Sequence, residues 1–421
     1  MHKIKKLKNG VRLVVNPIPN SHGVTTGIFV KTGSRYETAR QSGISHFLEH
    51  LFFKGTKLRP TPADLSRAIE GIGGYTNAST SQEYTFFYNR VPQKHQVRGL
   101  DVLADMMNNS LFNPDAIERE KGVVIEELNM YLDTPMRYIY DLIMNLTWPN
   151  SSLGRDIIGN KKTIRSFDRD DLLNYINENY QSRDIVVVAA GKVNYAKLQH
   201  QVEHYFNNWT NKKRHKFSKV TGKQKRARIM VSHKKTDQAH LCIAFPSIGY
   251  GHKSEAALAV LNTILGSGMS SRLFLNVREK HGLCYAVHSF IEKFQDVGMV
   301  GVSAGLNINR IELAIGAIME EVIKMTRQKV TMTELREAKE HIRGNISLQM
   351  DNSDNMAIWY GIQGLFYNKI QTPEQRIKKL LKVSQNDIIK LAKDLFRKDR
   401  LNMAIIGPFT NKDKIRFLKA V

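Results

Sequence analysis

Cysteine is scarce in this chain of 421 residues, which has only Cys242 and Cys284. Both lie in apolar, strand-like runs, and their spacing forms no disulfide or metal-binding pattern. This argues against a disulfide framework and indicates a reducing compartment. A run of about 18 apolar residues, long enough to cross a membrane, is also missing from the sequence. We therefore expect a cytoplasmic protein with no signal peptide and no membrane span.

Acidic residues are few relative to basic ones, since 39 Asp and Glu stand against 63 Lys and Arg, for a net charge of +24. A charge of this sign is typical of proteins that bind nucleic acids. However, the sequence has no helix-turn-helix, zinc-knuckle or RNA-recognition motif, and its basic residues are scattered rather than interleaved with aromatic ones. Nucleic-acid binding therefore stays a remote alternative. With 42% hydrophobic residues and no long low-complexity tract, the chain is expected to be globular.

The sequence repeats itself, and its length suits two domains of about 200 residues each. An apolar strand between two predicted helices occurs at Arg183–Gly191 and again at Arg400–Gly407. A predicted helix over 114–131 has a counterpart that begins at Met332. The two halves of the chain are therefore predicted to share one fold.

The repeat sets the expected domain boundaries and fold class. We predict an N-terminal domain over 1–210, a C-terminal homologous domain over 229–421, and a basic linker over 211–228 between them. Strands around 75–90 and 284–306 read as hairpins, and long helices lie between the strands. This pattern predicts an α+β fold in which each domain has a mixed, mainly antiparallel sheet packed with helices.

The most informative segment is His46-Phe-Leu-Glu-His50. Histidines four residues apart on a helix lie about 40° apart around its axis, so both imidazoles reach one point. The carboxylate of Glu49 lies beside that point. Two neutral imidazoles and a carboxylate suit a catalytic zinc, which needs ligands and a base for its water. The order H-x-x-E-H is the inverzincin signature.

The segment is expected to form a mostly buried helix. Ser45 is the expected N-cap, and Gly55 is expected to end the run. The apolar residues recur at helical spacing: Ile44, Phe47, Leu48, Leu51 and Phe52. A metal site on such a helix would be shielded from competing water.

A third metal ligand is expected from the predicted helix that begins at Pro114. Glu120 and Glu127 are seven residues apart, hence within about 20° of one face, so one could bind a metal while the other supports it. Glu126 points about 100° away, and Glu118 lies on the opposite side. Acidic residues on helices are usually solvated, so the spacing alone leaves the third ligand open.

Taken together, these motifs resemble the pitrilysin-type metallopeptidases, in the branch of the mitochondrial processing peptidase beta subunit and its bacterial homologues. The resemblance rests on His46-Phe-Leu-Glu-His50, on the Glu of Val-Val-Ile-Glu-Glu-Leu further along, on Gly74–Thr80, and on the pair Arg278 and Tyr285. It spans nearly the whole chain.

The resemblance implies a role for each residue of the zinc motif. It implies that His46, His50 and Glu127 bind one Zn²⁺ per chain, that Glu49 is the general base, and that Glu120 is a supporting carboxylate. The fold it implies is the two-domain half-shell of the processing peptidases.

The resemblance also implies how substrate binds. Asn77 and Ala78 would lie on an edge strand along which an extended peptide is laid. Arg278 and Tyr285 would be brought to the active site by the second domain, Arg278 holding a substrate carbonyl and Tyr285 the oxyanion. The implied function is a zinc-dependent endopeptidase that acts on unfolded peptides or leader segments, as a homodimer or as a heterodimer with an inactive homologue.

The main alternative lies within the same family, because catalytically silent partner subunits share this fold. Such subunits usually lack part of the metal motif, which is complete here. Only one half of the chain carries it, since the matching region of the second half, Ala257–Gly266, has no His and no acidic residue.

Overall fold

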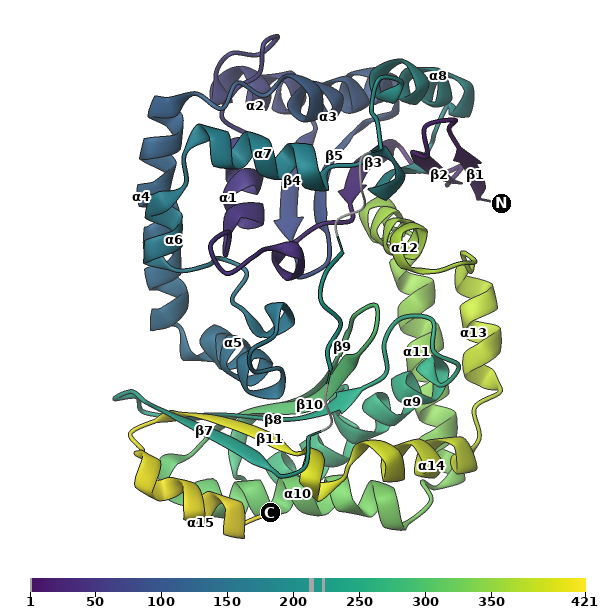
Figure 1. Cartoon of the computed structure of the whole chain (residues 1–421). Coiled ribbons are helices and arrows are strands. Elements are labelled where there is room, and N and C mark those ends of the chain that lie inside the picture. The colour runs from purple at the N-terminus through teal and green to yellow at the C-terminus, as the bar shows by residue number, and fades with distance from the viewer. Residues whose placement is uncertain (1, 212–215, 222–223) are drawn as a thin grey trace. The chain divides into compact units, whose positions relative to one another are not determined.

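The computed structural model describes residues 2–211, 216–221 and 224–421, and its helices and strands are shown in Figure 1. The chain forms two compact units. The first unit contains Met1–Asn129, Arg155–Ser218 and Leu348–Thr372, and the second contains Met130–Gly154, Lys219–Ser347 and Pro373–Val421. Each unit has one sheet with helices packed on it, which confirms the α+β prediction.

The first unit is built on a six-stranded sheet with the strand order β1-β2-β6-β3-β5-β4. The strands are β1 (Lys3–Lys6), β2 (Arg12–Pro17), β3 (Gly23–Val30), β4 (Tyr75–Thr80), β5 (Thr85–Pro92) and β6 (Ile185–Gly191). Only the β2–β6 pair is parallel. The central strands β3 and β6 are buried at every residue, whereas β4 lies at the edge and pairs only with β5.

Helices cover both faces of this sheet. Phe86 and Phe87 are adjacent on β5 and therefore point to opposite faces. Phe86 packs in the cluster formed with α12, while Phe87 packs edge-on against Phe52, which follows α1. The helices of this unit are α1 (Ile44–Leu51), α2 (Pro62–Glu70), α3 (Gln96–Asn109), most of α4 (Pro114–Asp133), α6 (Lys161–Ser166), α7 (Arg169–Asn179), α8 (Tyr195–Phe206) and α12 (Ser353–Phe366).

The second unit is built on a five-stranded sheet with the order β7-β11-β8-β10-β9. Its strands are β7 (Arg228–His233), β8 (Ala239–Ser247), β9 (Cys284–Lys293), β10 (Gly298–Leu306) and β11 (Asn402–Gly407), and only β7–β11 is parallel. Its helices are α5 (Pro135–Thr147), α9 (Glu255–Gly266), the π-helix η5 (Phe274–Lys280), α10 (Ile311–Arg327), most of α11 (Met332–Gln349), α13 (Pro373–Leu381), α14 (Gln385–Leu395) and α15 (Lys414–Lys419).

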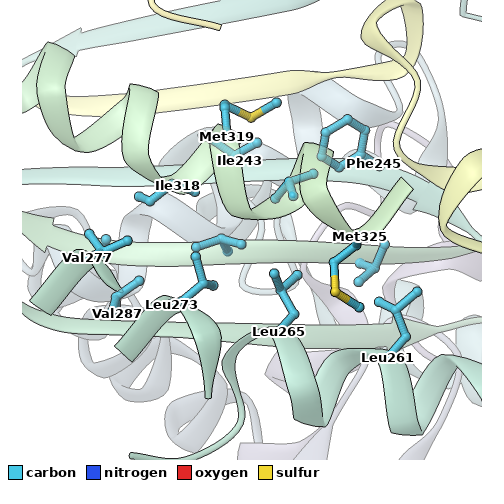
Figure 2. Close-up of a cluster of buried hydrophobic side chains, with 14 of the residues drawn as sticks. Ile243, Phe245, Leu261, Leu265, Leu273, Val277, Val287, Ile318, Met319 and Met325 are labelled. Atoms are coloured by element: carbon cyan, nitrogen blue, oxygen red, sulfur yellow. The ribbon is translucent and has the colours of Figure 1, made fainter. Parts of the chain in front are cut away.

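The core of the second unit lies between its sheet and helices α9 and α10, as Figure 2 shows. Ile243 and Phe245 of β8 contribute from the sheet, while Leu261 of α9 and Met325 of α10 contribute from the helices. All four are almost fully buried, and burying such a side chain contributes roughly 1.5–3 kcal/mol.

The two halves of the chain exchange a helix. Helix α5 belongs to the first half of the sequence but packs on β8 and β11 of the second unit, and α12 belongs to the second half but packs on β2, β3 and β6 of the first unit. The compact units therefore differ from the contiguous ranges 1–210 and 229–421 at these two helices. The physical reason is that each helix buries its apolar residues on the other half's sheet.

The expected linker over 211–228 lies partly outside the described residues, because 212–215 and 222–223 are not described. Its described part includes Lys216–Ser218, which belong to the first unit, and it ends where β7 begins. Among the described residues, no helix is long and apolar enough to span a bilayer.

Helix α1 forms where the sequence predicted a helix, but its cap differs. The helix begins after Gly43, so Ser45 lies inside its first turn and the expected Ser45 cap is wrong. The buried carboxylate of Glu37 takes that role, because it accepts the backbone N–H of Gly43 at 2.8 Å and that of Ser45 at 2.9 Å. The hydroxyl of Ser45 instead lies 2.8 Å from the hydroxyl of Tyr175.

Helix α12 should be sensitive to any side chain at Gly361. A Cβ atom there would lie 1.9 Å from Cε2 of Phe29, whose ring is fully buried and stacked on Phe86. We expect Gly361→Ala to lower the free energy of unfolding by about 1–3 kcal/mol. The matched control is Gly344→Ala at an exposed position of α11, where nothing lies within 4 Å of the added Cβ. There the change should raise the free energy of unfolding by about 0.5–1 kcal/mol, because alanine favours the helix more than glycine does. Melting temperatures that shift alike in both variants would contradict this packing.

Candidate metal centre

Helices α1 and α4 bring three side chains of the first unit to one point. The ligand atoms of His46, His50 and Glu127 lie within 4.8 Å of one another, and no other such group of three occurs among the described residues. Oε2 of Glu127 lies 3.3 Å from Nε2 of His50 and 3.7 Å from Nε2 of His46. The four-residue spacing on α1 thus aims both imidazoles at the same carboxylate, as the sequence predicted.

The geometry of these three residues fits a zinc ion. Tetrahedral ligands at about 2.0–2.2 Å from zinc lie roughly 3.3–3.6 Å apart, close to the distances between Glu127 and the two histidines. Oε2 of Glu127 is buried and makes no well-directed hydrogen bond in the described part of the chain. A buried carboxylate oxygen without a well-directed hydrogen bond is costly, and a cation would satisfy it.

Glu120 lies behind His50 rather than at the three-residue cluster. Its Oε1 is 2.8 Å from Nδ1 of His50, and its Oε2 is 2.6 Å from Nζ of Lys54. Such a carboxylate fixes the orientation and tautomer of a metal-binding imidazole. The sequence left Glu120 and Glu127 as alternatives for the third ligand, and the geometry separates them, since only Glu127 faces both Nε2 atoms.

The titration of the site follows from these contacts. Burial and the neighbouring charge of His50 lower the pKa of His46 to about 4. Burial also disfavours a charged His50, but the carboxylates of Glu120 and Glu127 outweigh it and raise its pKa to about 9. The contact with His50 lowers the pKa of Glu127. Near neutral pH the site therefore holds one extra proton, on His50, beside an ionised Glu127.

Glu49 lies on the same helix and meets the edge strand. It accepts a hydrogen bond from the hydroxyl of Thr80, the last residue of β4. Burial raises the pKa of Glu49, and the Thr80 hydrogen bond and the charge of His50 partly offset this. A carboxylate whose pKa is raised toward neutrality is suited to general base catalysis.

The edge strand β4 carries Asn77 and Ala78 at its middle. In the register with β5, Asn77 is opposite Tyr88 and Ala78 is opposite Phe87. The backbone N–H of Ala78 donates to the side-chain oxygen of Asn77 at 2.8 Å. The side of β4 away from β5 pairs with no other strand of the described chain.

Arg278 and Tyr285 belong to the second unit, where they lie close to each other. Arg278 is on η5 and Tyr285 is the second residue of β9. The guanidinium carbon of Arg278 is 4.6 Å from the ring centre of Phe274 and 5.6 Å from that of Tyr285. Tyr285 is 79% exposed, which is unusual for a large aromatic side chain.

Two residues of the site were missed by the sequence analysis. Lys54 follows His50 by four residues, a spacing that would place it on the same helical face, although α1 itself ends at Leu51. The sequence around Thr80 does not indicate its role, because its contact with Glu49 depends on how β4 packs against α1.

Comparison with known proteins identifies the family. Residues 12–161 match the family model described as insulinase, peptidase family M16, and residues 166–342 match the model described as the peptidase M16 inactive domain. The chain belongs to peptidase family M16. This confirms the resemblance drawn from the motifs. In this M16 chain, His46, His50 and Glu127 all lie within the residues that match the first model, and none of them lies within the residues that match the second.

Relatives of this M16 chain are named zinc proteases, although they are uncharacterized. An uncharacterized zinc protease of Bacillus subtilis is 36% identical over 96% of this chain and 98% of its own length. One of Streptomyces coelicolor is 31% identical over 99% of this chain and 91% of its own length. The fold is similar to that of a protease from Helicobacter pylori, with a TM-score of 0.90, 24% identity, and coverage of 97% and 99% of the two chains.

Protons and a metal should compete for this site. Because the pKa of His50 is about 9 and that of His46 about 4 in the metal-free protein, one proton must leave when a metal binds between about pH 6 and 8. The apparent affinity for Zn²⁺ should therefore rise about tenfold per pH unit in this range and level off above about pH 9. Competition with a chelator of known affinity at several pH values measures this. An affinity that does not change between about pH 6 and 8 would contradict a protonated His50 in the metal-free site.

Proposed function

We propose that this protein is a zinc-dependent endopeptidase that hydrolyses peptide bonds in unfolded peptides or leader segments. The observation that carries the proposal is the cluster of His46, His50 and Glu127, with Glu49 on the same helix. The zinc proteases among the relatives support it at the level of the family.

In this proposal each residue of the site has one role. His46, His50 and Glu127 hold one Zn²⁺, and Glu120 orients His50 through Nδ1. A bound zinc supplies Lewis acidity and lowers the pKa of water. Glu49 accepts the proton of the attacking water and delivers it to the leaving amine, as a general base and then a general acid.

The substrate is proposed to bind as an extended strand along β4. Backbone groups around Asn77 and Ala78 would pair with the peptide, because this edge of the sheet is open. Recognition through the backbone predicts broad side-chain specificity. Arg278 would hold a substrate carbonyl and Tyr285 would donate to the oxyanion. We also propose a homodimer, or a heterodimer with an inactive homologue, as the assembly that completes the site.

A catalytically silent subunit is the second candidate. The observation that favours it is the match of residues 166–342 to an inactive domain. The complete three-residue cluster and the partly buried Glu49 in the first unit favour the enzyme instead.

Substitution of single carboxylates separates the proposed roles. Glu49→Gln should keep zinc near one ion per chain but lower the hydrolysis rate by at least about 100-fold, because only the base is lost. Glu127→Gln should weaken zinc binding, because it removes a ligand. The matched control is Glu126→Gln, whose exposed carboxylate lies 3.5 Å from the amide of Asn129, and which should change neither property.

Zinc content by mass spectrometry and cleavage of a quenched peptide, with and without a chelator, give both readouts. Substantial activity in Glu49→Gln would show that the base is another residue. Unchanged zinc affinity in Glu127→Gln would show that the third ligand lies elsewhere. A wild type that binds zinc but cleaves no peptide would favour the silent subunit.

Mixing two inactive variants tests the proposed sharing of the site between two chains. On that proposal Glu49→Gln and Tyr285→Phe are each nearly inactive, but a mixed dimer has one site with both residues intact. Random exchange makes half of the dimers mixed, so activity should recover to about a quarter of the wild-type value. If differently tagged chains exchange and no activity returns, Tyr285 acts within its own chain or has no role.

A further inference from the structure

We propose that the buried ion pair between Arg35 and Glu83, covered by Phe217, positions the β4–β5 turn so that Thr80 reaches Glu49. This inference rests on the proposed function, because it assigns positioning residues to the same site. It concerns three residues that the zinc motif does not contain.

The ion pair joins two segments that are distant in sequence. Arg35 lies in the short helix η1 (Ser34–Tyr36) that follows β3, and Glu83 lies in the turn between β4 and β5. Nη1 of Arg35 is 2.6 Å from Oε1 of Glu83, and the two side chains are 0% and 2% exposed. The pair is therefore withdrawn from water, where a charged hydrogen bond is strong and its geometry is narrow.

Backbone contacts show how closely the two segments approach. The N–H of Arg35 donates to the carbonyl of Gln82 at 2.8 Å, and the N–H of Ser34 donates to that of Ser81 at 3.3 Å. A Cβ at Gly33 would lie 2.1 Å from the carbonyl oxygen of Ser81, so only glycine allows this approach. The ion pair thus adds a side-chain contact between two segments whose backbones are already hydrogen-bonded to each other.

Each of the two segments adjoins a residue that contacts helix α1. On one side, η1 runs into Glu37, whose carboxylate accepts the first N–H groups of the helix. On the other side, the β4–β5 turn begins just after Thr80, whose hydroxyl donates to Glu49. The Arg35–Glu83 pair therefore holds together the two segments that contact the start of α1 and its proposed base.

Phe217 covers the ion pair. Its ring centre is 3.9 Å from the guanidinium carbon of Arg35, and its ring packs edge-on against Tyr36 at 5.4 Å. An aromatic face over a guanidinium is favourable in itself and limits the access of water to the pair. Phe217 lies in the segment that leads to β7. The residue that covers the ion pair therefore comes from the connection between the two halves of the chain.

Stability alone is a weak reason for a buried ion pair at this place. Well-packed apolar side chains of similar volume are often as stabilising, whereas the loss of one partner is strongly destabilising. A buried charged hydrogen bond has a narrow range of distance and angle, so it fixes the relative position of the two segments. Apolar contacts are not directional and fix that position less tightly. That property matters where the turn must hold the Thr80 hydroxyl against a catalytic carboxylate.

Hydrogen exchange and kinetics of the full-length zinc enzyme test the proposal. We expect Glu83→Gln to speed amide exchange at residues 81–84 and to lower kcat by about 10–100-fold, with zinc content unchanged. The matched control is Asp105→Asn in the same unit, which neutralises another buried carboxylate, 2.6 Å from Arg59. It should lower the melting temperature to a similar extent but leave exchange at 81–84 and kcat unchanged.

A double-mutant cycle shows whether the pair acts through Thr80. If it does, Glu83→Gln combined with Thr80→Val should lower kcat no more than the stronger single variant. Full additivity, or equal effects of Asp105→Asn and Glu83→Gln on exchange at 81–84, would overturn the proposal.

A milder variant keeps the test decisive if Glu83→Gln does not fold. Phe217→Leu removes the aromatic cover without stranding a charge, and should speed exchange at 81–84 and lower kcat a few-fold. Unchanged exchange there would overturn the proposal. Because exchange needs no substrate, a wild type without peptidase activity would refute the proposed function while the exchange result still decided the role of the ion pair.

Discussion

The buried Oε2 atom of Glu127 lies 3.3 Å from Nε2 of His50 and 3.7 Å from Nε2 of His46, and the other residues of the candidate site are arranged around this contact. A carboxylate in such a place needs positive charge nearby. Without a metal, that charge is a proton on His50, whose pKa is raised to about 9. A divalent cation held by the same three residues would also neutralise the charge of Glu127, and it would bind the buried Oε2 atom directly.

Several layers of contacts hold these side chains in place. Glu37 fixes the start of α1 by accepting two backbone N–H groups. Glu120 and Lys54 form a chain of close contacts behind His50. Thr80 holds Glu49 from the edge strand. Catalytic groups that must be held within a fraction of an ångström need such support, because a loosely held site loses most of its effect.

The two halves of the chain repeat one topology but differ in chemistry. In each sheet a single pair of strands is parallel, and each half lends one helix to the other half's sheet. Helix α9, the counterpart of α1, has neither histidine nor an acid beyond its first residue, Glu255. That half instead exposes Tyr285 beside Arg278. His46, His50 and Glu127 all lie in the stretch that matches the M16 model, residues 12–161, and none of them lies in the stretch that matches the inactive-domain model, residues 166–342.

The sequence predicted the parts of the site that depend on local spacing. The histidines of α1 converge because residues four apart share a helical face, and both Glu120 and Glu127 point toward them for the same reason. Which glutamate faces the Nε2 atoms of both histidines depends on how α4 packs against α1, and helical geometry alone could not decide it. The helix exchange was missed because self-similarity reveals repeats and not their packing. Glu37 and Thr80 were missed because they act through tertiary contacts, as does the Arg35–Glu83 pair.

The most direct test of this account is an anomalous difference map from crystals of the zinc-loaded protein, measured above the zinc absorption edge. The account predicts one strong peak per chain, at about 2.0–2.2 Å from Nε2 of His46, Nε2 of His50 and a carboxylate oxygen of Glu127. A peak bound by other residues, or no peak between α1 and α4 in protein shown to contain zinc, would contradict it.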